Sequence, residues 1–133
     1  MKTIDETNYV DKAEQVIQQL KERVDKKGKP IPLVTTSKLR TLLSMTADIY
    51  NEVTAESGQK GELSSETVGR IEYLRLRFAY EAGREPAVRA LVEAASLMQI
   101  LKEIGGKKEN YLLFSRYMEA LVAFRKYYGG KDD

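Results

Sequence analysis

The chain has 133 residues, of which 42% are hydrophobic and 32% charged, and its formal net charge at neutral pH is +2. The absence of cysteine and histidine excludes disulfides, zinc–thiolate sites, histidine metal ligands and Ser-His or Cys-His nucleophiles. We expect neither a metal nor another cofactor. No signal peptide and no membrane-length apolar run is evident, so we predict a soluble cytoplasmic protein without a membrane partner.

The N-terminal region is predicted to form a charged helix followed by a linker. From about residue 7 to residue 27, Val10, Ala13, Ile17, Leu20 and Val24 recur at helical spacing. The sequence KKGKPIP then ends the helix, with Gly28 as a C-cap and the two prolines enforcing an extended connection. We therefore separate residues 1–32 from a core bundle over residues 33–130, both within a single helical domain, 1–133.

Two further helices are predicted on either side of a polar, glycine-containing loop at residues 56–62. The first begins at TTSK, with Thr36 or Ser37 as its cap, and carries an apolar stripe to about Val53. The second runs from about Ser65 to Ala82, and Gly83 is the expected stop.

The last part of the chain predicts two more helices. One starts at Pro86, where a missing amide proton costs nothing, and runs to about Ile104, before Gly105 and Gly106. It is apolar nearly all round, which is typical of a central helix. The other runs from about residue 108 to residue 128. Since strand signals are weak, the sequence predicts an all-α fold, a compact bundle of about five helices.

The most informative stretch is YLRLRFAYEAGR, residues 73–84. Arg70, Arg77 and Arg84 recur every seven residues and therefore lie in one row on a helix, with Tyr73 and Tyr80 beside it. A basic row edged by aromatic rings suits a nucleic-acid backbone. The alternative is an ordinary solvated face, in which Glu81 pairs with Arg77 four residues before it.

Two arginines lie within apolar arcs. Arg75 projects among apolar residues of its helix, and a charge there needs a buried carboxylate or a ligand phosphate as partner. Arg125 repeats the pattern, with Arg116 at the far edge of the same arc and Lys126 in the polar strip. These arginines predict either an interface with another chain or ordinary core packing with snorkelling side chains.

The remaining basic residues could either bind an anion or have a purely structural role. Lys38 and Arg40 oppose the helix dipole in the first turn of their helix, and an anion at the helix start would relieve this. The lysines at positions 26, 27 and 29 could touch nucleic acid, but lysines of a flexible linker rarely bind specifically. No carboxylate spacing matches a metal motif and no phosphate loop is present, so we expect no enzyme activity.

Three stretches together resemble the small subunit of the type III-A CRISPR effector, the second protein of the Csm complex. They are VTTSKLRTLLSM (34–45), YLRLRFAYEAGRE (73–85) and ENYLLFSRYMEALVAFRKYYGGK (109–131). The AGRE turn and the EALVA-F-K-Y-Y run are the most specific parts, and the resemblance covers about residues 33–131.

This resemblance implies a non-catalytic helical bundle that stacks in several copies, head to tail, beside the backbone subunits. The other implied partners are the large subunit, the guide RNA and the target RNA. The basic face of this chain would follow the duplex that the two RNAs form. The RNA-facing candidates carried onto this chain are Lys38, Arg40, Arg75, Arg77, Arg84, Arg116, Arg125 and Lys126. The alternatives are a protein–protein adaptor without RNA contacts and a free-standing single-strand nucleic-acid-binding protein.

Overall fold

The computed structural model describes residues 3–56 and 61–129. Within these residues it is all-α, as predicted, with six helices and only two isolated β-bridges. The helices are α1 (Tyr9–Lys21), α2 (Thr36–Ala55), α3 (Ser65–Arg84), α4 (Pro86–Ala94), α5 (Leu97–Glu103) and α6 (Lys108–Tyr127). Most of the predicted 56–62 loop, residue 130 and the 131–133 tail lie outside the described residues.

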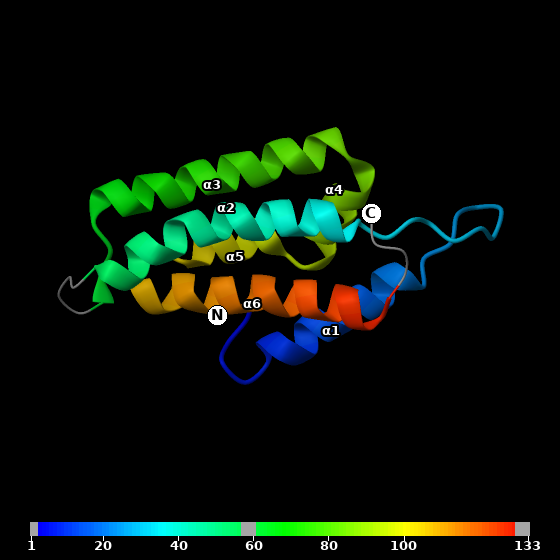
Figure 1. Cartoon of the computed structure of the whole chain (residues 1–133), viewed down its shortest axis with the longest axis horizontal. Coiled ribbons are helices and arrows are strands. Elements are labelled where there is room, and N and C mark those ends of the chain that lie inside the picture. Colours follow the sequence, from blue (N-terminus) through cyan, green and yellow to red (C-terminus); the bar gives the residue numbers. More distant parts are fainter. Residues whose placement is uncertain (1–2, 57–60, 130–133) are drawn as a thin grey trace.

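The helices form an elongated bundle in which α6 is the shared support. Helix α6 packs along α2 and α1, while α3 packs on α2 and α4 (Figure 1). The start of α2, the end of α3 and the end of α6 all point toward the same end of the molecule. We call it the hairpin end, because a loop between α1 and α2 projects from it.

The core is continuous across all six helices. Its largest fully buried side chains include Tyr111, Tyr117, Phe78 and Phe114. The two tyrosines satisfy their hydroxyls with backbone carbonyls, Tyr111 donating to Thr46 O at 2.6 Å and Tyr117 to Ala95 O at 3.0 Å. Buried hydroxyls that keep a partner avoid a desolvation cost and fix the angle of α6 against its neighbours.

Helix α1 ends at Lys21, six residues before the predicted end at residue 27. The reason lies in the next residues, where Asp25 Oδ1 accepts hydrogen bonds from the amides of Lys27 and Lys29. These local bonds compete with a helical backbone, and they fold residues 23–31 into a hairpin. Gly28, predicted as a helix cap, instead supplies the positive φ of this turn, at 80°.

Both long helices in the middle of the chain begin at a side-chain cap. Thr35, one residue before the predicted position, caps α2 by accepting from Lys38 N at 3.1 Å, and Ser64 caps α3 in the same way. Helix α3 passes the expected stop at Gly83 and ends at Arg84. Glu85 is extended because the following Pro86 disfavours a helical residue before it.

The helix predicted from Pro86 to Ile104 is two helices in the structure. Ser96 takes a left-handed conformation, with φ 57° and ψ 36°, and separates α4 from α5. The Ala95 carbonyl at this break accepts the Tyr117 hydroxyl instead of a helical amide. The apolar sequence is continuous across the break, so hydrophobicity alone could not reveal it.

Candidate nucleic-acid interface

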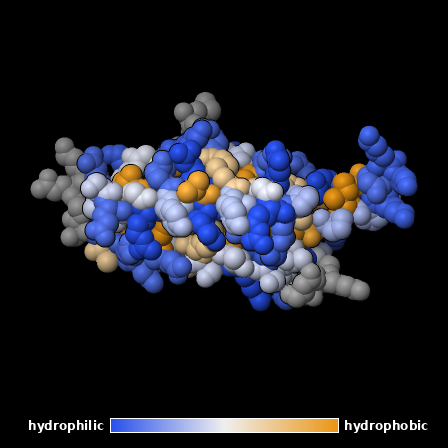
Figure 2. Space-filling view, turned by 90° about the horizontal axis from the view of Figure 1, so that it is seen from above, coloured by the Kyte–Doolittle hydropathy of each residue, from blue (hydrophilic) through white to orange (hydrophobic). Residues whose placement is uncertain are grey.

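Helix α3 exposes a second apolar row opposite its core face. Tyr73, Leu76 and Tyr80 are 59%, 62% and 55% exposed, although all three are large hydrophobic residues. Their spacing of three and four residues places them on one side of the helix. We call this row the α3 ridge. In Figure 2, which looks onto this side of the molecule, hydrophobic patches lie among hydrophilic ones.

The arginine row borders the α3 ridge, as the sequence predicts. The guanidiniums of Arg77 and Arg84 lie 5.6 and 5.5 Å from the centre of the Tyr80 ring, within cation–π range. Both also approach Glu81, at 3.6 and 3.8 Å, so the ion pair expected for a solvated face is present too. Because Arg77 and Arg84 remain about half exposed, the pairing leaves their outer edges accessible.

Arg70, the third member of the row, pairs with Glu52 of α2. Beside this pair, a groove of about 220 Å³ runs between α2 and α3. Its lining residues are Met45, Asp48, Ile49, Arg70, Tyr73, Leu74 and Arg77. The ion pair thus joins the two helices at the surface, and the Arg70 side chain remains 44% exposed.

The start of α2 brings two further candidates to the hairpin end. Lys38 lies 2.9 Å from Glu85, the residue between α3 and α4, and Arg40 is exposed. The Lys38–Glu85 pair therefore places the first turn of α2 beside the end of α3, where Arg84 lies (Figure 1). Lys126 is exposed near the end of α6, which points the same way.

Two candidates do not join this group. Arg75 lies on the other flank of α3 and forms a partly exposed ion pair with Glu72 at 3.1 Å, rather than an internal salt bridge. Arg116 is exposed near the middle of α6. The sequence motifs did not distinguish these positions from the clustered ones, because a heptad row shows one helix and not its neighbours.

Arg125 is the one candidate that the structure buries, with 3% of its surface exposed. Its Nε donates to the Val34 carbonyl at 2.7 Å and its Nη1 to the Gly129 carbonyl at 2.9 Å. Of the two explanations left open by the sequence, this geometry is that of a packing arginine. It ties the chain entering α2 to the end of α6.

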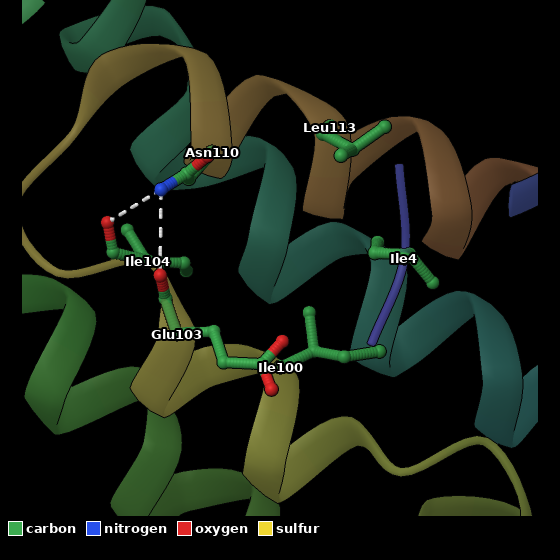
Figure 3. Close-up of a pocket in the computed structure, with 6 residues that line it drawn as sticks. All are labelled: Ile4, Ile100, Glu103, Ile104, Asn110 and Leu113. Atoms are coloured by element: carbon green, nitrogen blue, oxygen red, sulfur yellow. Dashed lines mark hydrogen bonds between the residues drawn. The ribbon is translucent and has the colours of Figure 1, made fainter. Parts of the chain in front are cut away.

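One pocket of the described residues lies beside the N-terminal segment. Figure 3 shows the pocket between the N-terminal Ile4 and helices α5 and α6, where Asn110 donates to the carbonyls of Glu103 and Ile104. Its volume of about 10 Å³ is near the minimum for one water. The described residues contain no group of three metal-ligating side chains. Nor do they contain a helix that could span a membrane.

The fold and this surface define a small all-α protein with partly exposed arginines and exposed tyrosines along one side of α3. Residues 13–131 match the family model Csm2 Type III-A. The chain is 44% identical to the CRISPR system Cms protein Csm2 of Streptococcus thermophilus over 99% of its length, covering 100% of that relative. It is 35% identical to the protein of the same description in Enterococcus italicus, over 87% of this chain and 86% of the relative.

The chain therefore belongs to the Csm2 family, the small subunits of the type III-A CRISPR Csm complex. This confirms the family that its three motifs resemble.

Proposed function

We propose that this chain is a non-catalytic structural subunit of a cytoplasmic Csm complex that binds the backbone of the guide–target RNA without reading its sequence. Guide pairing would supply the specificity. The observation that carries this proposal is the placement of the Arg77 and Arg84 guanidiniums within 5.6 and 5.5 Å of the centre of the exposed Tyr80 ring. A planar guanidinium held at a fixed position matches a phosphate better than a flexible point charge does.

Further cations would extend the contact along the hairpin end. Lys38, Arg40 and Lys126 lie toward the same end as Arg84 and carry the proposal beyond a single helix. Arg75 and Arg116 are proposed as secondary contacts on other faces. We assign Arg125 a structural role, because both of its described hydrogen bonds go to backbone carbonyls of this chain.

A contact with other protein subunits is the second candidate function, and the α3 ridge favours it. An exposed leucine such as Leu76, between two tyrosines, contributes little to phosphate binding but is suited to a protein interface. Contacts along the ridge would support head-to-tail stacking of copies beside the backbone subunits and the large subunit. The RNA contact and this protein contact use adjacent sides of α3, so they are compatible.

The proposed RNA contact is tested by Arg77→Ala combined with Arg84→Ala. In purified Csm complex, we expect the variant to retain less target RNA at low salt, and we expect its deficit relative to wild type to shrink as salt increases, because it makes fewer salt-sensitive phosphate contacts. For the isolated chain with single-stranded RNA, log K falls with log [salt] by about 0.7 per phosphate contacted. The double variant should therefore flatten this slope by about 1.4.

Arg89→Ala provides the matched control, because Arg89 is an exposed arginine of α4 that pairs with Glu93. It should leave RNA retention and the salt slope unchanged. If the double variant behaves like Arg89→Ala while complex assembly fails, the adaptor function is correct and the RNA proposal is wrong.

A further inference from the structure

The loop between α1 and α2 is a hydrogen-bonded hairpin rather than an extended connection. Residues 23–31 fold back on themselves, with an isolated antiparallel bridge between Val24 and Pro30. Ile31 N donates to Arg23 O at 2.9 Å, and Asp25 N donates to Lys29 O at 2.7 Å. The hairpin projects from the bundle beyond the start of α2 and the end of α3 (Figures 1 and 2).

The tip of the hairpin is held by Asp25. Its carboxylate accepts the amides of Lys27 and Lys29 at 2.8 and 3.0 Å, while its carbonyl accepts the amide of Gly28 at 2.9 Å. The turn is thus fixed by backbone amides, so that the side chains of the lysines are not needed to maintain it.

The base of the hairpin is attached to the core. Three residues after Ile31, Val34 is 1% exposed, and its carbonyl accepts the buried Arg125. On the other side, Lys21 donates to the Tyr128 carbonyl at 2.7 Å. A hairpin anchored on both sides presents its tip at a defined place, which reduces the entropy lost on binding a partner.

The hairpin carries all of the net positive charge of the chain. Residues 23–31 contain four basic residues and one acidic residue, a net charge of +3, whereas the whole chain has +2. The other residues therefore sum to −1. Lys26, Lys27 and Lys29 are exposed, and none forms an ion pair with a carboxylate within residues 3–56 and 61–129.

We propose that the hairpin is a separate phosphate-binding element, which holds an RNA backbone through Lys26, Lys27 and Lys29. Three flexible ammonium groups on a fixed turn can follow phosphates without recognising bases. An acidic protein surface is the less suitable occupant, since protein interfaces are depleted in lysine and enriched in aromatic residues, which the hairpin lacks. The proposal shares with the proposed function only its class of ligand.

The test combines Lys26→Gln, Lys27→Gln and Lys29→Gln in the full chain, leaving the backbone bonds of the turn in place. With a uridine oligomer at low ionic strength, the salt slope should fall by about 2, since each phosphate contact contributes about 0.7. The control combines Arg89→Gln, Lys102→Gln and Lys107→Gln, three exposed cations outside the hairpin. It removes the same net charge and should change the slope much less. Circular dichroism of both variants checks that they remain helical.

A second measurement uses the assembled complex, with and without target RNA. Acetylation of lysines, read by mass spectrometry, should be slowed by RNA at Lys26, Lys27 and Lys29 but not at Lys102. The proposal would be overturned if the hairpin lysines were acetylated equally with and without target RNA. It would also be overturned if the hairpin variant and the control variant had the same dependence of log K on log [salt]. Loss of other subunits with RNA binding unchanged would also overturn it, since the occupant would then be a protein.

The α3 variant separates this proposal from the proposed function. If the Arg77→Ala, Arg84→Ala double variant flattens the dependence of log K on log [salt] and the hairpin variant does not, only the hairpin proposal fails. If the hairpin variant alone flattens it, the hairpin binds RNA and the α3 site does not.

Discussion

At the scale of single residues, Arg125 and Lys126 are neighbours in sequence with different environments. Arg125 is buried and donates to two carbonyls, whereas Lys126 is exposed. A one-residue step on a helix turns the side chain by about 100°, and that rotation separates the core from the solvent. The same motif can therefore supply a packing residue and a candidate RNA contact at consecutive positions.

Arg125→Ala is expected to lower the free energy of unfolding by about 2–4 kcal/mol, because it leaves the buried Val34 carbonyl and the partly buried Gly129 carbonyl without their charged donor. Chemical denaturation monitored by circular dichroism measures this change. Lys126→Ala is the control for stability and should stay within about 0.5 kcal/mol of the wild type, as usual for exposed positions. An Arg125→Ala protein as stable as the wild type would show that the two carbonyl bonds contribute little.

The candidate site could be predicted in part at this scale. The seven-residue spacing correctly placed Arg77 and Arg84 in one row with Tyr80 beside them, and it anticipated the Arg77–Glu81 pair. It could not reveal that Lys38 meets Glu85, because that contact depends on how α2 and α3 pack. The exposure of Leu76 could have been inferred from its spacing of three and four residues from the ridge tyrosines.

At the scale of helices, the break between α4 and α5 is the largest difference from the predicted fold. Each of the other predicted helices is present, because apolar spacing and caps are local signals that packing did not override. The break depends on a distant residue: the Tyr117 hydroxyl satisfies the Ala95 carbonyl that a continuous helix would have used. Burial accordingly raises the pKa of Tyr117 to about 12.

Ser96→Gly tests the strain stored at this break. A left-handed serine costs roughly 1–2 kcal/mol, while glycine loses more backbone entropy on folding. We expect a net stabilisation of about 0.5 kcal/mol, measured by thermal and chemical unfolding. Ala94→Gly, at the last helical residue of α4, should instead destabilise by up to about 1 kcal/mol. Equal destabilisation by both substitutions would show that Ser96 is not strained.

At the scale of the whole molecule, the N-terminal segment is joined to the far end of α5. Thr3 donates its amide and hydroxyl to the Glu103 carboxylate at 2.8 and 2.9 Å, and Ile4 is buried beside it. Burial raises the pKa of Glu103, but the hydrogen bonds from Thr3 and Gln99 outweigh it and hold the pKa below its usual value of 4.5. Residues far apart in sequence are thus linked through one carboxylate.

This lowered pKa predicts how stability changes with acid. The Glu103 carboxyl binds its proton more readily in the unfolded state than in the folded state. Its contribution to the free energy of unfolding is therefore complete above the unfolded pKa and is lost as pH falls through the folded pKa. Glu103→Gln should therefore cost about 1 kcal/mol at neutral pH, and the difference from wild type should shrink below about pH 4.5. Urea unfolding over a pH series measures it. A difference that stays constant with pH would contradict the expectation.

The hairpin gives the molecule a charge asymmetry with kinetic consequences. With +3 on nine residues at one end and −1 summed over the remainder, the nearly neutral protein behaves as a dipole along its long axis. In the field of a polyanion such a molecule is turned before contact, so collisions occur preferentially with one end leading. Removing the three hairpin lysines should consequently slow association more than it speeds dissociation. Added salt should abolish that orienting torque once the screening length falls below the length of the bundle.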